Sequence, residues 1–172
     1  PFLQAPAVRC SHPMNRDWCN GFRYDGGAQG HYESYFQRAN HPTRPLAFWV
    51  RYTAFAPKGR PGDAVGELWA IWFDGEAGEV TAVKEVVPWG RCAFSARGLD
   101  VAIGEARLDG AGLTGSASAL GRTVGWSLRY TAPAEPLLLL PEGLYRGGFP
   151  KAKALVERQA ELEGQSLCDA LD

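Results

Sequence analysis

The sequence lacks several features that would indicate a function class directly. No apolar run approaches the ~20 residues that span a bilayer, and the longest greasy run is the leucine stretch at 137–140. Lys and Arg number 18 against 19 Asp and Glu, and they form no basic run. A balanced surface of this kind argues against nucleic acid or an anionic membrane as the main partner.

Catalytic and metal-binding motifs are also missing. The histidines His12, His31 and His41 form no closely spaced metal set, and no C-x-x-C motif indicates zinc. No Gly-x-Ser-x-Gly elbow is present, and the Gly-rich stretch at 147–149 has no phosphate-loop pattern. We therefore expect no metal and no cofactor.

The four cysteines leave the redox state open. They stand at Cys10, Cys19, Cys92 and Cys168. Free thiols in a reducing compartment are one interpretation, and together with the lack of a visible signal peptide they predict a cytoplasmic protein. A bridge between Cys10 and Cys19, across a loop-like segment, is the alternative.

What the sequence contains favours β structure. It has 172 residues, which suits one domain, with 21 Gly, 12 Pro and 12 % aromatics. Gly and Pro punctuate short elements, while aromatic and β-branched residues favour sheets. Turn signals recur every ten residues or so, and this spacing predicts an all-β meander that curls into a barrel or pairs with a second sheet. The expected strands are 31–39, 46–56, 65–73, 79–87, 92–95, 100–108, 113–120 and 123–131.

The two ends of the chain are less regular. We expect an irregular lead-in over 1–28, with one short strand near 7–10, before a β domain over 29–150. A last buried strand is expected at 137–141. In the tail, 151–172, Leu155, Gln159 and Leu162 have helical spacing and helix is the preferred prediction. A strand leading to a further unit is the alternative.

Three of the aromatic-rich strands each carry one charge that a plain core would not need: Glu33, Arg51 and Glu67. Side chains alternate across a strand, so Glu67 shares the more apolar face of its strand with Trp69. We therefore predict that Glu67 points into the interior. An unpaired carboxylate there would cost several kcal/mol, so it must find a cation, a hydrogen bond or a proton.

Two interpretations of these charges remain open. If the strands are sequential neighbours, Arg51 can lie between Glu33 and Glu67 and form a ladder that sets the strand register. Alternatively, the charges form the polar floor of an apolar pocket lined by tryptophan rings. On the second interpretation Glu67 is the candidate catalytic residue, and the candidate ligand-binding residues are Glu33, Tyr35, Trp49, Arg51, Trp69 and Trp72.

Four segments resemble one known family. They are the run at 30–75 (GHYESYFQRANHPTRPLAFWVRYTAFAPKGRPGDAVGELWAIWFDG), WSLRYT at 126–131, LLLLPEGLY at 137–145 and GGFPKAKAL at 147–155. Over 29–156 the chain is similar to the N-terminal lipocalin-like domain of hydroxyneurosporene synthase (carotenoid hydratase) and AttH-like proteins. The resemblance implies a calycin-type fold with two β halves in tandem and an apolar ligand. It also implies that 151–172 is a tail or linker toward a second half that this sequence does not include.

Three functions follow as hypotheses. The first is a hydratase- or cyclase-type lyase or isomerase acting on an isoprenoid or polyene, with Glu67 as the proton donor and tryptophan rings stabilising a carbocation. Arg51 works against this role, because a nearby cation favours the ionised acid. The second is a non-catalytic carrier of an apolar small molecule. The third is an interaction subunit that pairs through a sheet edge with its own kind or with a second β-domain.

Overall fold

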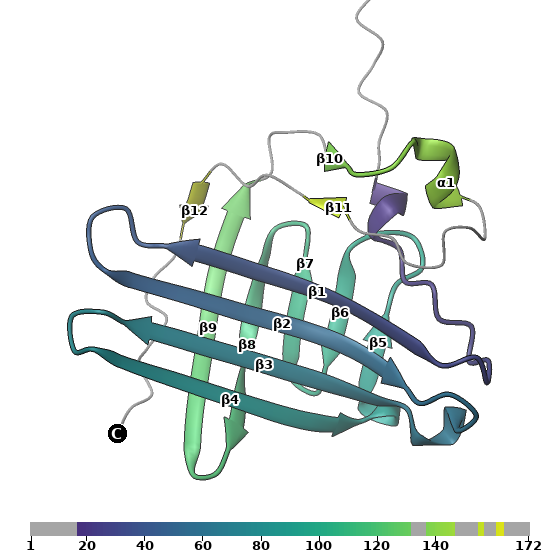
Figure 1. The fold of residues 1–172 in the computed structure, drawn as a ribbon, viewed down its shortest axis with the longest axis horizontal. Helices are drawn as coiled ribbons and strands as arrows, with labels where there is room; N and C mark the ends of the chain where they lie inside the picture. Colours follow the sequence, from purple (N-terminus) through teal and green to yellow (C-terminus); the bar gives the residue numbers. More distant parts are fainter. Residues whose placement is uncertain (1–16, 132–136, 147–154, 157–160, 164–172) are drawn as a thin grey trace, which may run out of the picture.

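The computed structural model describes residues 17–131, 137–146, 155–156 and 161–163 (Figure 1). Its first four strands are rich in aromatic and β-branched residues, which favour extended backbone. They form one antiparallel sheet in chain order, which we call the front sheet. Its strands are β1 (His31–Asn40), β2 (Leu46–Ala56), β3 (Val65–Asp74) and β4 (Glu79–Pro88).

A second antiparallel sheet lies behind the front sheet, and Figure 1 shows its strands crossing the first set steeply. Its order is β12-β9-β8-β7-β6-β5. Sheets that pack face to face in this way bury the inward residues of both. In the described part of the chain, no ladder joins the two sheets into a closed barrel. The strands are β5 (Cys92–Phe94), β6 (Asp100–Ile103), β7 (Ala106–Asp109), β8 (Gly112–Ala119), β9 (Arg122–Thr131) and β12 (Glu161–Glu163).

The remaining elements are short. Within the described ranges, no helix has the length and apolar character that a membrane span requires. The short elements are η1 (Asp17–Asn20), η2 (Pro61–Asp63), η3 (Trp89–Arg91), α1 (Glu142–Arg146), and the pair β10 (Leu137–Leu138) and β11 (Leu155–Val156).

The fold class expected from the sequence, a lipocalin-like antiparallel meander, is confirmed.

The predicted strand boundaries in the front sheet agree closely with the structure. The second strand matches at both ends, and the others differ by one residue. The hairpin after β3 forms because the Asp74 carboxylate accepts hydrogen bonds from the backbone N–H groups of Glu76 and Ala77. The strand predicted at 100–108 is divided into β6 and β7, because the chain turns at Gly104, which has a φ of 58°.

The ends of the chain gave the weaker predictions. The preferred helix in the tail is wrong for the described residues, because 155–156 and 161–163 are strands. The second of these pairs with β9, so sheet pairing overrides helix propensity there. Of the last buried strand, only Leu137–Leu138 is a strand. The strand near 7–10 lies outside the described residues, and the division of the chain at 28 and 150 stays a prediction.

The core between the sheets is organised around Tyr52, which is fully buried. The indole N–H of Trp126 donates to the Tyr52 hydroxyl at 2.8 Å, and that hydroxyl donates to the Arg107 carbonyl at 2.8 Å. The two rings meet edge to face, with centroids 6.1 Å apart. Burial raises the pKa of Tyr52, which keeps this hydroxyl a donor.

The buried set decides which way each strand faces. Val50 and Tyr52 of β2, and Leu68 and Ala70 of β3, all belong to the core. Because neighbouring side chains point to opposite faces of a sheet, the residues between them point away from the core. We call this surface of the front sheet, opposite the core, the outer face.

The Tyr52 hydrogen bonds generate a first prediction. Replacing Tyr52 with Phe would leave the Trp126 indole and the Arg107 carbonyl unpaired in the core, so it should destabilise the fold by about 1–3 kcal/mol. Urea denaturation would measure the loss in free energy of unfolding. The matched control is Tyr32→Phe, which removes a hydroxyl from a side chain that is 56 % exposed and should change little. Equal effects of the two changes would contradict this role for Tyr52.

Candidate functional site

The outer face brings together four of the seven predicted site residues. Its side chains come from alternate positions of β1 to β4, and the ladder aligns them in rows across the four strands. Phe36, Arg51, Trp69 and Lys84 form the central row. The members of the predicted set that lie on this face are Trp49, Arg51, Glu67 and Trp69.

The prediction that Glu67 points into the interior is wrong. The buried face of β3 carries Gly66, Leu68 and Ala70, and Glu67 lies on the other side. Small residues are needed there because the sheets approach closely: a Cβ placed on Gly66 would lie 2.5 Å from the Cys92 sulfur. The bulkier side of β3, taken from the sequence as the inner one, is the outer face.

The predicted Glu–Arg–Glu ladder does not form either. Arg51 lies opposite Phe36 on β1 and Trp69 on β3, whereas Glu33 lies opposite Ala54. An offset of one residue moves a side chain to the other face of a sheet. Glu33 is therefore on the core side of the front sheet, and Arg51 is on the outer face.

Glu67 has two partners on the outer face. The Lys84 ammonium lies 2.7 Å from one carboxylate oxygen, and the Trp69 indole N–H donates to the other at 3.1 Å. The Lys84 ammonium also lies 4.6 Å from the centroid of the Trp69 ring. The Glu67 side chain is 13 % exposed, and its carboxylate is held by one residue of its own strand and one of β4.

Arg51 lies among aromatic rings and has no anionic partner in the described part of the chain. Its guanidinium carbon is 5.1 Å from the centroid of Trp49, 5.2 Å from that of Trp69 and 5.7 Å from that of Tyr32. Its Nε is buried and makes no hydrogen bond to any described residue, and the same holds for the Thr53 hydroxyl. The rings stabilise the cation but leave its N–H donors unused.

The two outermost strands of the front sheet, β1 and β4, present exposed apolar side chains on the outer face. Phe36 is 54 % exposed, Val80 57 % and Val86 54 %. Several exposed large apolar side chains on one face of a folded protein indicate a place where a ligand or partner binds. The exposed apolar residues of the outer face are Tyr32, Phe36, Phe55, Phe73, Val80 and Val86.

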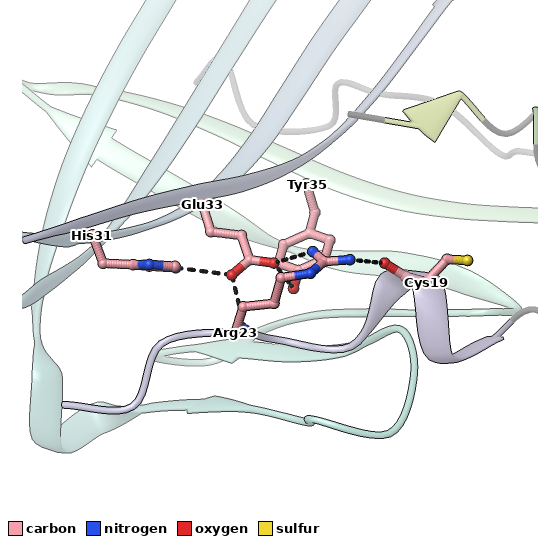
Figure 2. A network of polar contacts seen from close by, with 5 residues as sticks. All are labelled: Cys19, Arg23, His31, Glu33 and Tyr35. Atoms are coloured by element: carbon pink, nitrogen blue, oxygen red, sulfur yellow. Dashed lines mark hydrogen bonds and ion pairs between the residues drawn. The ribbon is translucent and has the colours of Figure 1, made fainter. Parts of the chain in front are cut away.

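A second polar cluster lies on the core side of β1, around Glu33 (Figure 2). Its carboxylate accepts from the Arg23 backbone N–H at 3.0 Å, from the Arg23 guanidinium at 3.0 Å and from the Tyr35 hydroxyl at 3.2 Å. The His31 ring nitrogen lies 2.9 Å away. The Arg23 guanidinium also donates to the carbonyl of Cys19 in η1.

The Glu33 cluster acts as a structural attachment. The carboxylate already has four contacts, about as many as its lone pairs allow, so it has little capacity left for a ligand. Burial, with a smaller contribution from Glu33, raises the pKa of Tyr35, which keeps its hydroxyl a donor. The cluster fastens the segment after η1 to β1. Phe22 of the same segment stacks on Phe94 of β5, with centroids 4.5 Å apart.

The last predicted ligand-binding residue, Trp72, lies apart from both clusters. It stands opposite Phe48 in the ladder and packs partly buried against the core. A cavity of about 380 Å³ lies elsewhere and includes none of the predicted site residues. Its lining is mainly polar and consists of Leu68, Glu85, Arg91, Ile103, Gly104, Glu105, Ser116 and Ser118.

Metal and thiol chemistry have little support in the described ranges. No group of three or more His, Cys, Asp or Glu residues there is arranged to hold a metal ion. Cys92 is a free thiol whose S–H points to the Pro88 carbonyl at 3.5 Å, and burial raises its pKa. The proposed Cys10–Cys19 bridge is untested, because Cys10 lies outside the described residues.

Two important residues, Lys84 and Arg23, carry no signal in the sequence pattern. Lys84 is an ordinary charge in its strand, and only the β3–β4 register places it opposite Trp69 and near Glu67. Arg23 lies in an irregular segment, where no periodic pattern relates it to Glu33. The clearest available signal was the small-residue pattern of Gly66 and Ala70, which marks the inner face of β3.

Comparisons with protein-family models, with curated proteins and with solved structures found no match to this chain. The resemblance to the carotenoid hydratase family therefore stays a prediction. Of the surfaces described above, the outer face is the one with exposed apolar rings and a cation available to a ligand.

The Glu33 cluster generates the second prediction. Glu33→Gln would replace an acceptor oxygen by an amide that cannot accept from Arg23, so we expect a loss of about 2 kcal/mol in the free energy of unfolding. Hydrogen exchange should become faster over residues 17–24, and urea denaturation would measure the global loss. Glu76→Gln is the control, because Glu76 pairs with Arg44 at the exposed surface and should contribute little. Unchanged exchange over 17–24 would contradict the attachment role.

Proposed function

We propose that this protein is a non-catalytic binding domain for an amphipathic molecule with an acidic group. The apolar part of the ligand lies on the outer face, and its acidic group pairs with Arg51. One observation carries the proposal: Arg51 is held among three aromatic rings, and no acidic residue in the described ranges pairs with it.

The apolar character of the ligand follows from the margin of the face. Tyr32 and Phe36 on one side, and Val80 and Val86 on the other, expose large apolar areas to water. Covering such a side chain contributes about 1.5–3 kcal/mol when burial is complete. A hydrocarbon chain laid across these strands would gain part of this free energy from several residues at once.

The acidic group follows from the donors of Arg51. A guanidinium binds a carboxylate through two parallel hydrogen bonds, and such charge-assisted bonds are stronger than neutral ones. The rings of Trp49 and Trp69 limit the movement of the Arg51 side chain, so less freedom is lost when it binds.

The geometry supports binding better than hydration of an alkene. A general acid must carry a proton to donate, whereas Glu67 is already paired with the Lys84 ammonium and the Trp69 indole. Its face is also open at the margin, so water would reach a carbocation formed there. Glu67 as a proton donor stays a prediction that this arrangement does not favour.

A titration with a simple amphipath tests the proposal. Dodecanoate, added below its critical micelle concentration, should change the fluorescence of Trp49 and Trp69, whose rings flank Arg51. Dodecanol, which has no acidic group, should bind more weakly. Arg51→Met keeps an unbranched side chain between the rings but removes the charge. It should weaken dodecanoate binding about tenfold or more, because charge-assisted hydrogen bonds contribute about 1.5–3 kcal/mol.

The control for this titration is Arg38→Met, which removes an exposed cation from the same face and should leave the dissociation constant nearly unchanged. If dodecanoate and dodecanol bind equally, and Arg51→Met has no effect, the assignment of the acidic group is wrong. If neither molecule binds at the highest concentration that its solubility allows, the outer face is not a binding surface for amphipaths.

A further inference from the structure

The free edge of β1 carries an inference that is independent of the proposed ligand. In the described part of the chain, β1 pairs only with β2, so one side of this ten-residue strand has no partner strand. We propose that β1 pairs in an antiparallel arrangement with β1 of a second copy. The two front sheets then form one continuous sheet, with the two outer faces side by side.

The edge of β1 lacks three of the devices that prevent such pairing, although the strand does carry the charged residues Glu33 on its core side and Arg38 on its outer face. Natural edge strands are kept short, interrupted by a bulge, or given Lys or Pro. β1 has no Lys or Pro, and its register against β2 runs unbroken from His31 to Asn40. Its outer-face side chains include the exposed rings of Tyr32 and Phe36. A long and regular edge of this kind favours association.

The other edge strand of the front sheet differs. β4 approaches the second sheet, where the Glu85 carboxylate accepts from the backbone N–H of Ser118 in β8 at 2.9 Å. It also ends at Pro88, which cannot donate to a ladder. Of the two edges of the front sheet, β1 is therefore the one available for pairing.

The hydrogen bonds at the hairpins identify which residues of β1 face the free edge. The His41 N–H donates to the Leu46 carbonyl, and the Gly75 N–H donates to the Pro45 carbonyl. Backbone groups alternate between the two sides of an antiparallel strand. The backbone groups of odd-numbered β2 residues, which continue the pattern from Pro45, therefore hydrogen-bond to β3. Those of even-numbered β2 residues, such as Leu46, hydrogen-bond to odd-numbered residues of β1. Even residues of β1 present their N–H and C=O groups to the edge.

A two-fold pairing centred on Tyr35 satisfies these groups. It places Ser34 opposite Phe36 of the second copy, and Tyr32 opposite Arg38 of the second copy. Both contacts occur twice by symmetry. Tyr32 and Arg38 are exposed in the single chain, and facing each other they form a cation–π pair. In this register, Glu33 of one chain does not face Glu33 of the other, and the two Arg38 side chains do not face each other, so no like charges meet.

A proline substitution tests the edge directly. Ser34→Pro removes an N–H that faces the free edge, while the ladder to β2 uses other residues, so the fold should persist. Light scattering coupled to size exclusion should give the mass of two chains for the natural protein and for the control Ser34→Ala. In Ser34→Pro the dissociation constant should rise about tenfold or more, since two edge hydrogen bonds are lost per dimer.

A cross-linking experiment tests the register even if the proline variant fails to fold. Facing residues of an antiparallel pair lie at about 5.5 Å between Cα atoms, within the range of a disulfide. A mixture of Ser34→Cys and Phe36→Cys proteins should therefore oxidise to a cross-linked dimer faster than either protein alone, with the natural protein as the background.

Three results would overturn the pairing. One is a single-chain mass at every concentration of the natural protein. Another is a dimer that Ser34→Pro, folded by circular dichroism, leaves unchanged. The third is a mixture that cross-links no faster than its components. Dodecanoate binding to a single chain would survive any of these, so the two proposals can fail separately.

Discussion

The packing of Tyr52 against Trp126 determines the orientation of the front sheet, and the rest of the account depends on it. Once the Tyr52 hydroxyl accepts from the Trp126 indole and donates to the Arg107 carbonyl, it cannot turn outward without leaving buried groups unpaired. Because side chains alternate along a strand, Arg51 then lies on the outer face. Residues that face each other in the ladder share a face, so Glu67, opposite Thr53, lies on the outer face as well. One buried contact thus decides which charges face the core and which are available to a ligand.

The outer face and the edge of β1 are two aspects of one surface. Exposed aromatic rings indicate a surface that a partner or ligand covers, and Tyr32 and Phe36 also border an edge that has no partner strand in the described part of the chain. Pairing two copies at this edge would extend the apolar surface without covering Arg51.

The sequence predicted the strands better than it predicted their faces. Alternating aromatic and β-branched residues located 46–56 correctly, because turn residues bound that strand on both sides. In β3 both faces are apolar, so alternation alone could not choose between them, and Glu67 was assigned to the wrong side. The small residues Gly66 and Ala70 were the sequence signal for the inner side, and the structure gives the reason, since the second sheet packs closely against Gly66. The Glu33 cluster could not be predicted, because Arg23 lies in an irregular segment where no periodic pattern relates it to β1.

The most direct test of the central claim is an NMR measurement of the indole N–H signals during a titration with dodecanoate. The protein has six tryptophans, and substitution of each in turn would assign their signals. The account predicts that Trp49 and Trp69 shift with dodecanoate concentration while Trp126 does not, because Trp126 is buried between the sheets. Shifts of the Trp126 signal, with Trp49 and Trp69 unchanged, would place the ligand in the interior and contradict the account.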